Sequence, residues 1–271
     1  MASATGIPDS NRSTTNGREE DEPLLGRAGD ASQQDGKGIQ FNFVLGTLIP
    51  SSPPLPLSPS SQVTTNTNNT PTTGTAIIAQ AGIWILVATI WASVFLHPVI
   101  LFSAHPLLNS AGLLLVTQAI LILQPTHAPK QKKHGTNIHA IFNGSAVLSL
   151  LAGLIVIEYN KIAHSGTHFE SPHAILGLIT YILFAVQAVV GITQYYTPGL
   201  YGSVDNAKSV YKYHRMSGYV LLILSFATVA AATQTGFNVM TLHIQLWAVI
   251  VASVITLVGV LPRIKKGKLG F

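Results

Sequence analysis

Residues 212–218 read Lys212-Tyr213-His214-Arg215-Met216-Ser217-Gly218, and here a basic, tyrosine-rich loop becomes a long apolar run. An ionisable imidazole at the mouth of a membrane-spanning helix is costly unless something binds it, so His214 is a candidate functional residue. Three other histidines open apolar runs in the same way, namely His105, His139 and His173. The prediction of fold and function starts from these four positions.

The composition indicates an integral membrane protein. Of the 271 residues, 48% are hydrophobic and only 9% are charged, a balance that ordinary soluble surfaces do not have. The chain contains no cysteine, which excludes disulfides, thiolate metal sites and a cysteine nucleophile, so a tightly held metal must use His, Met, Tyr or carboxylate ligands. The net charge of +5 is explained by the excess of Lys and Arg that cytosolic loops of membrane proteins carry, and it does not indicate nucleic-acid binding.

Residues 1–75 are rich in Ser, Thr, Asn, Gly and Pro, and we expect them to form a disordered tail. No apolar segment near the start combines a basic flank with a small-residue cleavage site, so we expect no cleaved signal peptide. Within the tail, Glu20 lies four positions before the pair Leu24-Leu25, which resembles the acidic dileucine signal that sorting adaptors bind on vacuolar, lysosomal and endosomal proteins. An ordinary acidic patch explains the same residues equally well.

Residues 76–262 predict six membrane-spanning helices, because a span needs about 20 apolar residues. The first apolar region, 76–124, is long enough for two spans, with a break between His97-Pro98 and His105-Pro106, since proline disfavours helical geometry in the residue before it. The five connections are short, so the sequence predicts an all-α, up-and-down bundle followed by a basic segment at 263–271. The expected helices cover about residues 76–96, 104–124, 137–157, 172–194, 214–234 and 241–262.

The distribution of lysine and arginine predicts the orientation of this bundle. On one side the connections and the C-terminus carry ten of them, and on the other side only Lys161 appears. By the positive-inside rule, both termini then face the cytosol. The ten are Lys130, Lys132, Lys133, Lys208, Lys212, Arg215, Arg263, Lys265, Lys266 and Lys268.

This orientation arranges the four histidines in two pairs. His105 and His173 begin helices that enter from the non-cytosolic face, whereas His139 and His214 begin helices that enter from the cytosolic face. Each pair comes from alternate helices, where two inward imidazoles could clamp a flat macrocycle such as haem. Two axial histidines leave haem iron no open position, which favours electron transfer over oxygen binding. Hydrogen bonding to lipid headgroups or water explains any one of these histidines alone, but not matched pairs on four successive helices.

The other six histidines have simpler explanations. His164 and His168 share a non-cytosolic loop and could touch a metal or a ferric chelate there, although loop histidines are usually solvated. Solvation at loops and helix ends also explains the remaining four, which are His97, His127, His134 and His243.

The central region, about residues 76–262, resembles the cytochrome b561 family. The resemblance rests on His105-Pro106-Leu107-Leu108, on Lys132-Lys133 leading to His139, on residues 168–173 with Gly177, and above all on His214-Arg215-Met216-Ser217-Gly218-Tyr219. It implies a six-helix bundle with a central four-helix core that holds two b haems. It also implies the axial pairs His105 with His173 and His139 with His214.

Members of that family pass electrons from cytosolic ascorbate across the membrane to monodehydroascorbate or ferric iron. The resemblance therefore implies a transmembrane oxidoreductase of the ascorbate-dependent ferrireductase or monodehydroascorbate reductase type. Two segments depart from the animal and plant members: Leu121-Ile122-Leu123-Gln124-Pro125 replaces their Ala-Leu-Leu-Val-Tyr-Arg, and Glu170-Ser171-Pro172-His173-Ala174 replaces their Ser-Leu-His-Ser-Trp. The chain looks closer to the stand-alone b561 domain-containing proteins, so the identity of the donor stays open.

Four cations are candidates for the cofactor site. Lys132, Lys133, Lys212 and Arg215 lie where they could neutralise haem propionates or an anionic donor at the cytosolic mouth. Their effect on membrane orientation explains them equally well.

Two other functional classes compete with electron transfer. One is a cofactor-free transporter or channel in which the histidines relay protons, and the other is a structural membrane scaffold. Transporters usually carry membrane-embedded acids or broken helices near the midplane, and the expected spans have no Asp or Glu in their interiors. The sequence leaves open the donor, the acceptor, the organelle, and whether the protein is a monomer or a homodimer.

Overall fold

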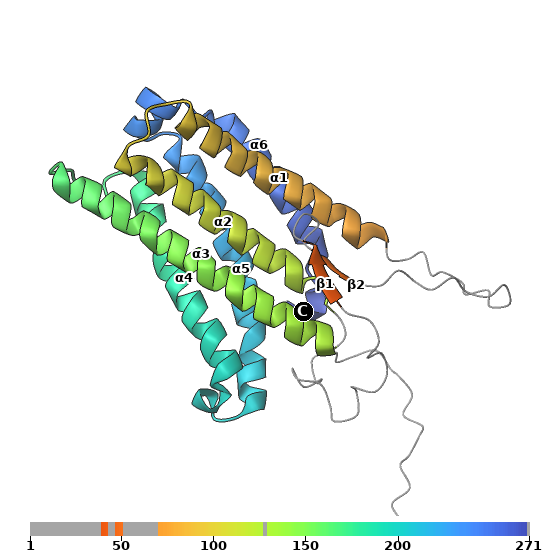
Figure 1. Cartoon of the computed structure of the whole chain (residues 1–271). Coiled ribbons are helices and arrows are strands. Elements are labelled where there is room, and N and C mark those ends of the chain that lie inside the picture. Colours follow the sequence, from red (N-terminus) through yellow and green to blue (C-terminus); the bar gives the residue numbers. More distant parts are fainter. Residues whose placement is uncertain (1–38, 43–46, 51–69, 127–128, 270–271) are drawn as a thin grey trace, which may run out of the picture.

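The computed structural model describes residues 39–42, 47–50, 70–126 and 129–269. Its long helices are α1 (Thr70–Phe95), α2 (Ala104–Leu123), α3 (Pro129–Ala163), α4 (Pro172–Tyr196), α5 (Val204–Ala232) and α6 (Leu246–Val260). In this described part, 6 helices are long and apolar enough to cross a membrane, and they lie alongside one another as a bundle (Figure 1). The expected six-helix bundle is confirmed, and the chain is a multi-pass membrane protein.

Four of the helices form a ring. Helix α2 packs on α3, α3 on α4, α4 on α5, and α5 returns to α2. Helices α1 and α6 pack on each other and join the ring through α2 and α5 (Figure 1). The helices that face each other diagonally across the ring are therefore α2 with α4, and α3 with α5.

The α1–α6 contact is close because glycines remove side chains from it. A Cβ atom at Gly259 would lie 2.2 Å from the backbone nitrogen of Ala79, and one at Gly82 would lie 2.4 Å from that of Thr256. Such backbone approach is typical of helix pairs in lipid, where packing rather than hydrophobic burial drives association. The α1–α6 pair therefore forms a closely packed flank of the ring.

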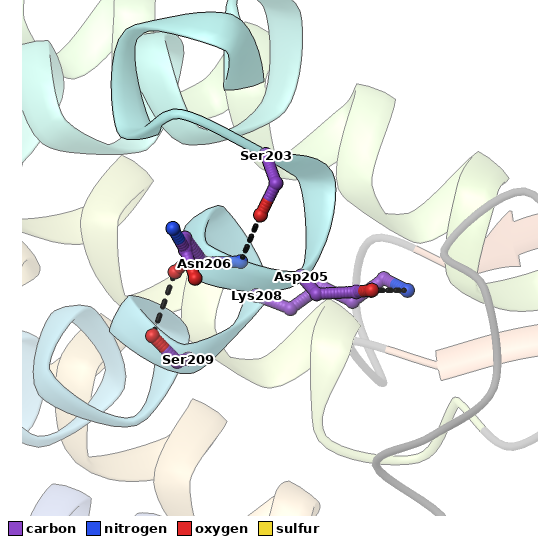
Figure 2. A network of polar contacts seen from close by, with 5 residues as sticks. All are labelled: Ser203, Asp205, Asn206, Lys208 and Ser209. Atoms are coloured by element: carbon purple, nitrogen blue, oxygen red, sulfur yellow. Dashed lines mark hydrogen bonds and ion pairs between the residues drawn. The ribbon is translucent and has the colours of Figure 1, made fainter.

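Helices α3 and α5 begin earlier than the sequence predicted, at Pro129 and Val204 rather than at 137 and 214. Charged residues end a membrane span but not a helix, and a proline in the first turn is compatible with a helix start. The hydroxyl of Ser203 accepts a hydrogen bond from the Asn206 backbone nitrogen at 3.1 Å, which caps α5 (Figure 2). A Lys208–Asp205 ion pair at 3.1 Å follows in the first turn (Figure 2).

The expectation that His139 and His214 begin their helices was therefore wrong. Each lies ten positions inside its helix, counted from Pro129 and Val204. His105 and His173, in contrast, are the second residues of α2 and α4, respectively.

The two ends of the bundle differ in charge. One end, called here the basic end, contains the α2–α3 connection, the α4–α5 connection and the segment after α6. The other end is called the opposite end.

Helix α6 begins later than predicted, at Leu246 rather than at 241. Residues Asn238–Leu242 form a π-helical turn, and His243 follows with a φ of 55° in the left-handed region. The Asn238 carboxamide stabilises this bend, because its Nδ2 donates to the Ile244 backbone oxygen at 2.9 Å and its Oδ1 accepts from the Ile244 nitrogen at 3.1 Å. The polar side chain thus replaces backbone hydrogen bonds that the bend removes.

Two short antiparallel strands, β1 (Ile39–Asn42) and β2 (Thr47–Pro50), lie in the segment that was expected to be disordered (Figure 1). Ile39, Phe41 and Ile49 are residue types that favour extended backbone, a signal that the overall polar composition concealed. Helix α1 also starts inside the expected tail, at Thr70. The proposed sorting residues Glu20, Leu24 and Leu25 lie outside the described residues.

Candidate functional site

The ring brings the four predicted histidines together in two pairs across its diagonals. The ring centres of His105 on α2 and His173 on α4 are 6.2 Å apart, with the ring planes at 87°. Those of His139 on α3 and His214 on α5 are 6.5 Å apart, with the planes at 73°. These are the same partners that the sequence analysis assigned.

Three of the imidazoles are anchored on the backbone of a neighbouring helix. The Nδ1 atom of His105 lies 2.9 Å from the Gly153 oxygen, that of His139 lies 2.8 Å from the Ala119 oxygen, and that of His173 lies 3.0 Å from the Thr228 oxygen. Because a carbonyl only accepts, Nδ1 carries the proton and the Nε2 lone pair is left for a metal. Metal-ligating histidines commonly have this arrangement, which fixes the ring and raises its basicity.

These backbone acceptors follow a regular spacing. Ala119 lies fourteen positions after His105 in α2, Gly153 fourteen after His139 in α3, and Thr228 fourteen after His214 in α5. Fourteen residues make nearly four helical turns, which separates the two histidine pairs by about 21 Å along the bundle. The hairpins α2–α3 and α4–α5 therefore place their histidines at the same spacing along the bundle.

His214 is the exception among the four. Its Nδ1 is buried and, within the described residues, has no hydrogen-bond partner. Its backbone oxygen instead accepts a hydrogen bond from Nε2 of Gln187, the residue fourteen positions after His173. A Cβ atom at Gly191 would lie 2.9 Å from Cε1 of the His214 ring, so the ring packs directly on the backbone of α4.

Both pairs fit a metal held between two imidazoles. Two nitrogen–metal bonds of about 2 Å each place the ring centres about 6 Å apart. Spacing alone does not decide the matter, because His97 and His243 at the opposite end also have ring centres 6.3 Å apart. The four ring histidines differ from these two because they lie on diagonal helices and three are anchored through Nδ1 to an adjacent helix.

A cavity of about 610 Å³ opens beside the pair nearer the basic end, and both His139 and His214 line it. Its walls are mostly apolar, and Gly144, Gly191 and Gly218 contribute no side chain to them. A flat, largely apolar macrocycle fits such a cavity, since cofactor sites are concave and apolar with few polar groups. The residues present therefore fit a bis-histidine haem.

The lining of this cavity is positively charged. Two of the four candidate cations, Lys132 and Arg215, line it together with Arg263 and Lys265, whereas no Asp or Glu occurs among its described lining residues. The predicted Lys133 and Lys212 do not line it: Lys133 is exposed on α3, and the Lys212 ammonium lies 5.1 Å from the centre of the Tyr213 ring. Both lysines lie on helix faces that do not line the cavity. The sequence alone does not reveal which face of a helix lines a cavity.

Arg263 and Lys265 are lining residues that the sequence analysis missed. Arg263 is buried, and its Nε donates to Oε1 of Gln124 at 2.7 Å, which ties the end of α6 to the end of α2. Gln124 also donates through Nε2 to the Tyr219 hydroxyl at 3.2 Å. The sequence shows Arg263 only as one charge in a basic segment, because its burial depends on how the end of α6 meets the end of α2.

The structure gives His164 and His168 separate partners in the loop at the opposite end. His168 Nδ1 lies 3.1 Å from a Glu158 carboxylate oxygen, and His164 Nδ1 lies 2.8 Å from the Asn160 backbone oxygen. Both histidines are exposed. Among the described residues, no group of 3 His, Cys, Asp or Glu side chains is placed to hold a metal ion.

Comparison with known proteins identifies similar chains. The family model for eukaryotic cytochrome b561 matches residues 104–240, which include all four histidines and the ring. A putative transmembrane ascorbate-dependent reductase CYB561 homolog of Caenorhabditis elegans is 25% identical over 164 residues, which are 55% of this chain and 61% of the relative. Ascorbate-specific transmembrane electron transporter 2 of Zea mays is 27% identical over 133 residues, 47% of this chain and 53% of the relative.

A human relative, transmembrane ascorbate-dependent reductase CYB561, is 24% identical over 157 residues, 57% of this chain and 60% of that protein. The chain therefore spans less than two thirds of the length of each of these curated relatives.

Proposed function

The chain belongs to the eukaryotic cytochrome b561 family, a family that binds haem b, and from that premise we propose that it transfers electrons across a membrane through two b haems. His105 with His173 would hold one haem and His139 with His214 the other. When bound, each haem would supply a one-electron carrier. The observation that carries the proposal is the pair of diagonal imidazole contacts, 6.2 and 6.5 Å between ring centres.

The residues of this chain would orient and separate the two carriers. Backbone oxygens of Gly153, Ala119 and Thr228 hold three of the imidazoles, and the backbone at Gly191 supports the fourth. The two haem sites would lie about 21 Å apart along the bundle, so an electron would cross the membrane in several shorter transfers. The hydrocarbon around the bundle excludes water and ions, and no proton or substrate would need to cross with the electron.

The positive lining of the cavity supports an anionic electron donor. Lys132, Arg215, Arg263 and Lys265 would attract a small organic anion and neutralise the haem carboxylates. Ascorbate, which the names of the relatives specify, is such an anion. We propose that the basic end faces the cytosol, that the donor acts there, and that monodehydroascorbate or a ferric chelate accepts the electron at the opposite end.

This activity makes the protein a transmembrane oxidoreductase. We further propose that both termini are cytosolic, that a sorting adaptor binds Glu20 with Leu24 and Leu25, and that the protein resides in a vacuolar or endosomal membrane, as a monomer or a homodimer. Replacement of both leucines by alanine should then move it away from that membrane. The replacement should leave its absorption spectrum unchanged.

Anaerobic single-turnover kinetics test the proposed reaction. The purified, oxidised protein should be reduced by ascorbate and reoxidised by ferric citrate, with both steps visible in its absorption spectrum. A transporter or a structural scaffold would show neither step. Reduction by dithionite but not by ascorbate would leave electron transfer in place and exclude ascorbate as the donor.

A further inference from the structure

The two histidine pairs share the residue types that lie four positions after each histidine. On α2 and α3 each histidine is followed four positions later by an asparagine, Asn109 after His105 and Asn143 after His139. The Nδ2 atom of each asparagine donates to the backbone oxygen of its own histidine at 2.8 Å. On α4 and α5 the corresponding residues are Gly177 and Gly218. The two sites therefore begin as equivalents.

A tyrosine breaks this equivalence. The Tyr181 hydroxyl, on α4, donates to Oδ1 of Asn109 at 2.6 Å. Tyr181 lies eight positions after His173, and the residue eight positions after His214 on α5 is Leu222, a fully buried side chain without a hydroxyl. The hydroxyl contact therefore belongs to the His105–His173 site and has no counterpart at the corresponding position of the other site.

The Asn109 carboxamide is held at the edge of the His105 ring. Its Nδ2 lies 3.3 Å from Nδ1 of His105, in addition to its bond to the His105 backbone oxygen. Gly153 leaves room for it, because a Cβ atom at that position would lie 2.5 Å from Nδ2 of Asn109. The oxygen of Gly153 also accepts from His105 Nδ1 at 2.9 Å. Tyr181, Asn109, His105 and Gly153 thus form one polar cluster that joins α4, α2 and α3.

We propose that Tyr181 and Asn109 are positioning residues that make the His105–His173 site a stronger electron acceptor than it would otherwise be; this inference rests on the proposed function. The tyrosine bond keeps the carboxamide turned so that its positive N–H end faces the imidazole. A fixed positive dipole beside an iron ligand disfavours the more positive, oxidised state of the iron, and burial strengthens the effect. Electrons arriving from the other site then move toward the opposite end of the bundle.

Redox titration of the purified, haem-loaded full chain tests this inference. The midpoint potential of each spectral component is measured, and the component that His105→Ala removes is assigned to the His105–His173 site. In Tyr181→Phe, which deletes only the hydroxyl, that component should shift to lower potential while the other stays unchanged and haem content is retained. Gly153→Ala, whose Cβ would displace the Asn109 amide, should shift the same component in the same direction.

Tyr159→Phe is the matched control, because Tyr159 is an exposed tyrosine on α3 away from the cluster; both of its midpoints should equal those of the parent. Unchanged midpoints in both test variants, or equal shifts of both components, would overturn the inference. If Tyr181→Phe loses haem, the Gly153→Ala titration decides by the same criterion. A parent protein without any b-type spectrum would overturn the proposed function itself and the inference with it.

Discussion

Gly191 lies so close to His214 that a Cβ atom on the glycine would come within 2.9 Å of Cε1 of the imidazole. No other residue type has a side chain small enough for this contact. The backbone of α4 therefore supports the one ring histidine whose Nδ1 has no hydrogen-bond partner among the described residues.

We expect Gly191→Ala to displace the His214 ring and to weaken or abolish the haem at the basic end. The purified variant should retain about half of the parental haem, because the added Cβ atom disturbs only one of the two proposed haem sites. Pyridine haemochrome absorbance per mole of protein measures this ratio. Gly199→Ala is the control, because nothing lies within 4 Å of a Cβ atom at that position; equal haem content in Gly191→Ala and this control would contradict the placement of His214.

Arg263→Gln should slow reduction by ascorbate while haem content is retained. The guanidinium lines the cavity, and its Nε is held at 2.7 Å by Gln124. Loss of this charge should cost about tenfold in the second-order rate, about 1.4 kcal/mol, and the difference should shrink as salt is added. Stopped-flow spectroscopy gives the rates. Lys133→Gln removes a charge that lies outside the cavity, and an equal loss of rate there would show that the overall charge, not the site, attracts the donor.

Gln118→Leu should destabilise the bundle without changing the site. Gln80 on α1 and Gln118 on α2 are buried and exchange two hydrogen bonds, at 2.6 and 2.7 Å. Removing one carboxamide leaves the other with fewer partners in a dry interior, at a cost of about 1–2 kcal/mol in unfolding free energy. Thermal unfolding in detergent measures the loss. The double variant Gln80→Leu/Gln118→Leu should recover part of it, and a double variant less stable than either single one would contradict this account.

The orientation predicts that the tail is never glycosylated. Asn68-Asn69-Thr70 is an acceptor sequence that would be modified only in the secretory lumen, and positive-inside counting assigns it to the cytosol. Glycosidase treatment should therefore cause no shift on gels, and protease added to the cytosolic face of sealed vesicles should digest the tail. Glycosylation of Asn68 would show that the bundle has the opposite orientation in the membrane, and it would contradict the proposed direction of electron flow.

The fold was predictable from the sequence because hydropathy and length determine membrane spans. Six apolar runs with short connections predicted six helices in an up-and-down bundle, and the structure has them. The ends of α3 and α5 were not predictable, because a membrane boundary is marked by charges whereas a helix boundary is set by caps such as Ser203. For the same reason the depth of His139 and His214 in their helices was misjudged.

The partners of the four histidines followed from topology, since alternate helices of a closed four-helix ring face each other. What surrounds each imidazole did not follow. The acceptor oxygens of Gly153, Ala119 and Thr228 become visible only once the register of each hairpin is known. Arg263 was missed because its burial depends on how the end of α6 meets the end of α2, and a cation in a basic segment otherwise carries no distinguishing signal.

The central claim is that two diagonal histidine pairs each hold a b-type haem. The most direct measurement is haem stoichiometry together with the dithionite-reduced minus oxidised spectrum of the purified protein and of four alanine variants. The parent should contain two haems per chain. His105→Ala and His173→Ala should both lose one spectral component, and His139→Ala and His214→Ala should both lose the other. Absence of a b-type band, or loss of the same component in His105→Ala and His139→Ala with the other left intact, would contradict the account.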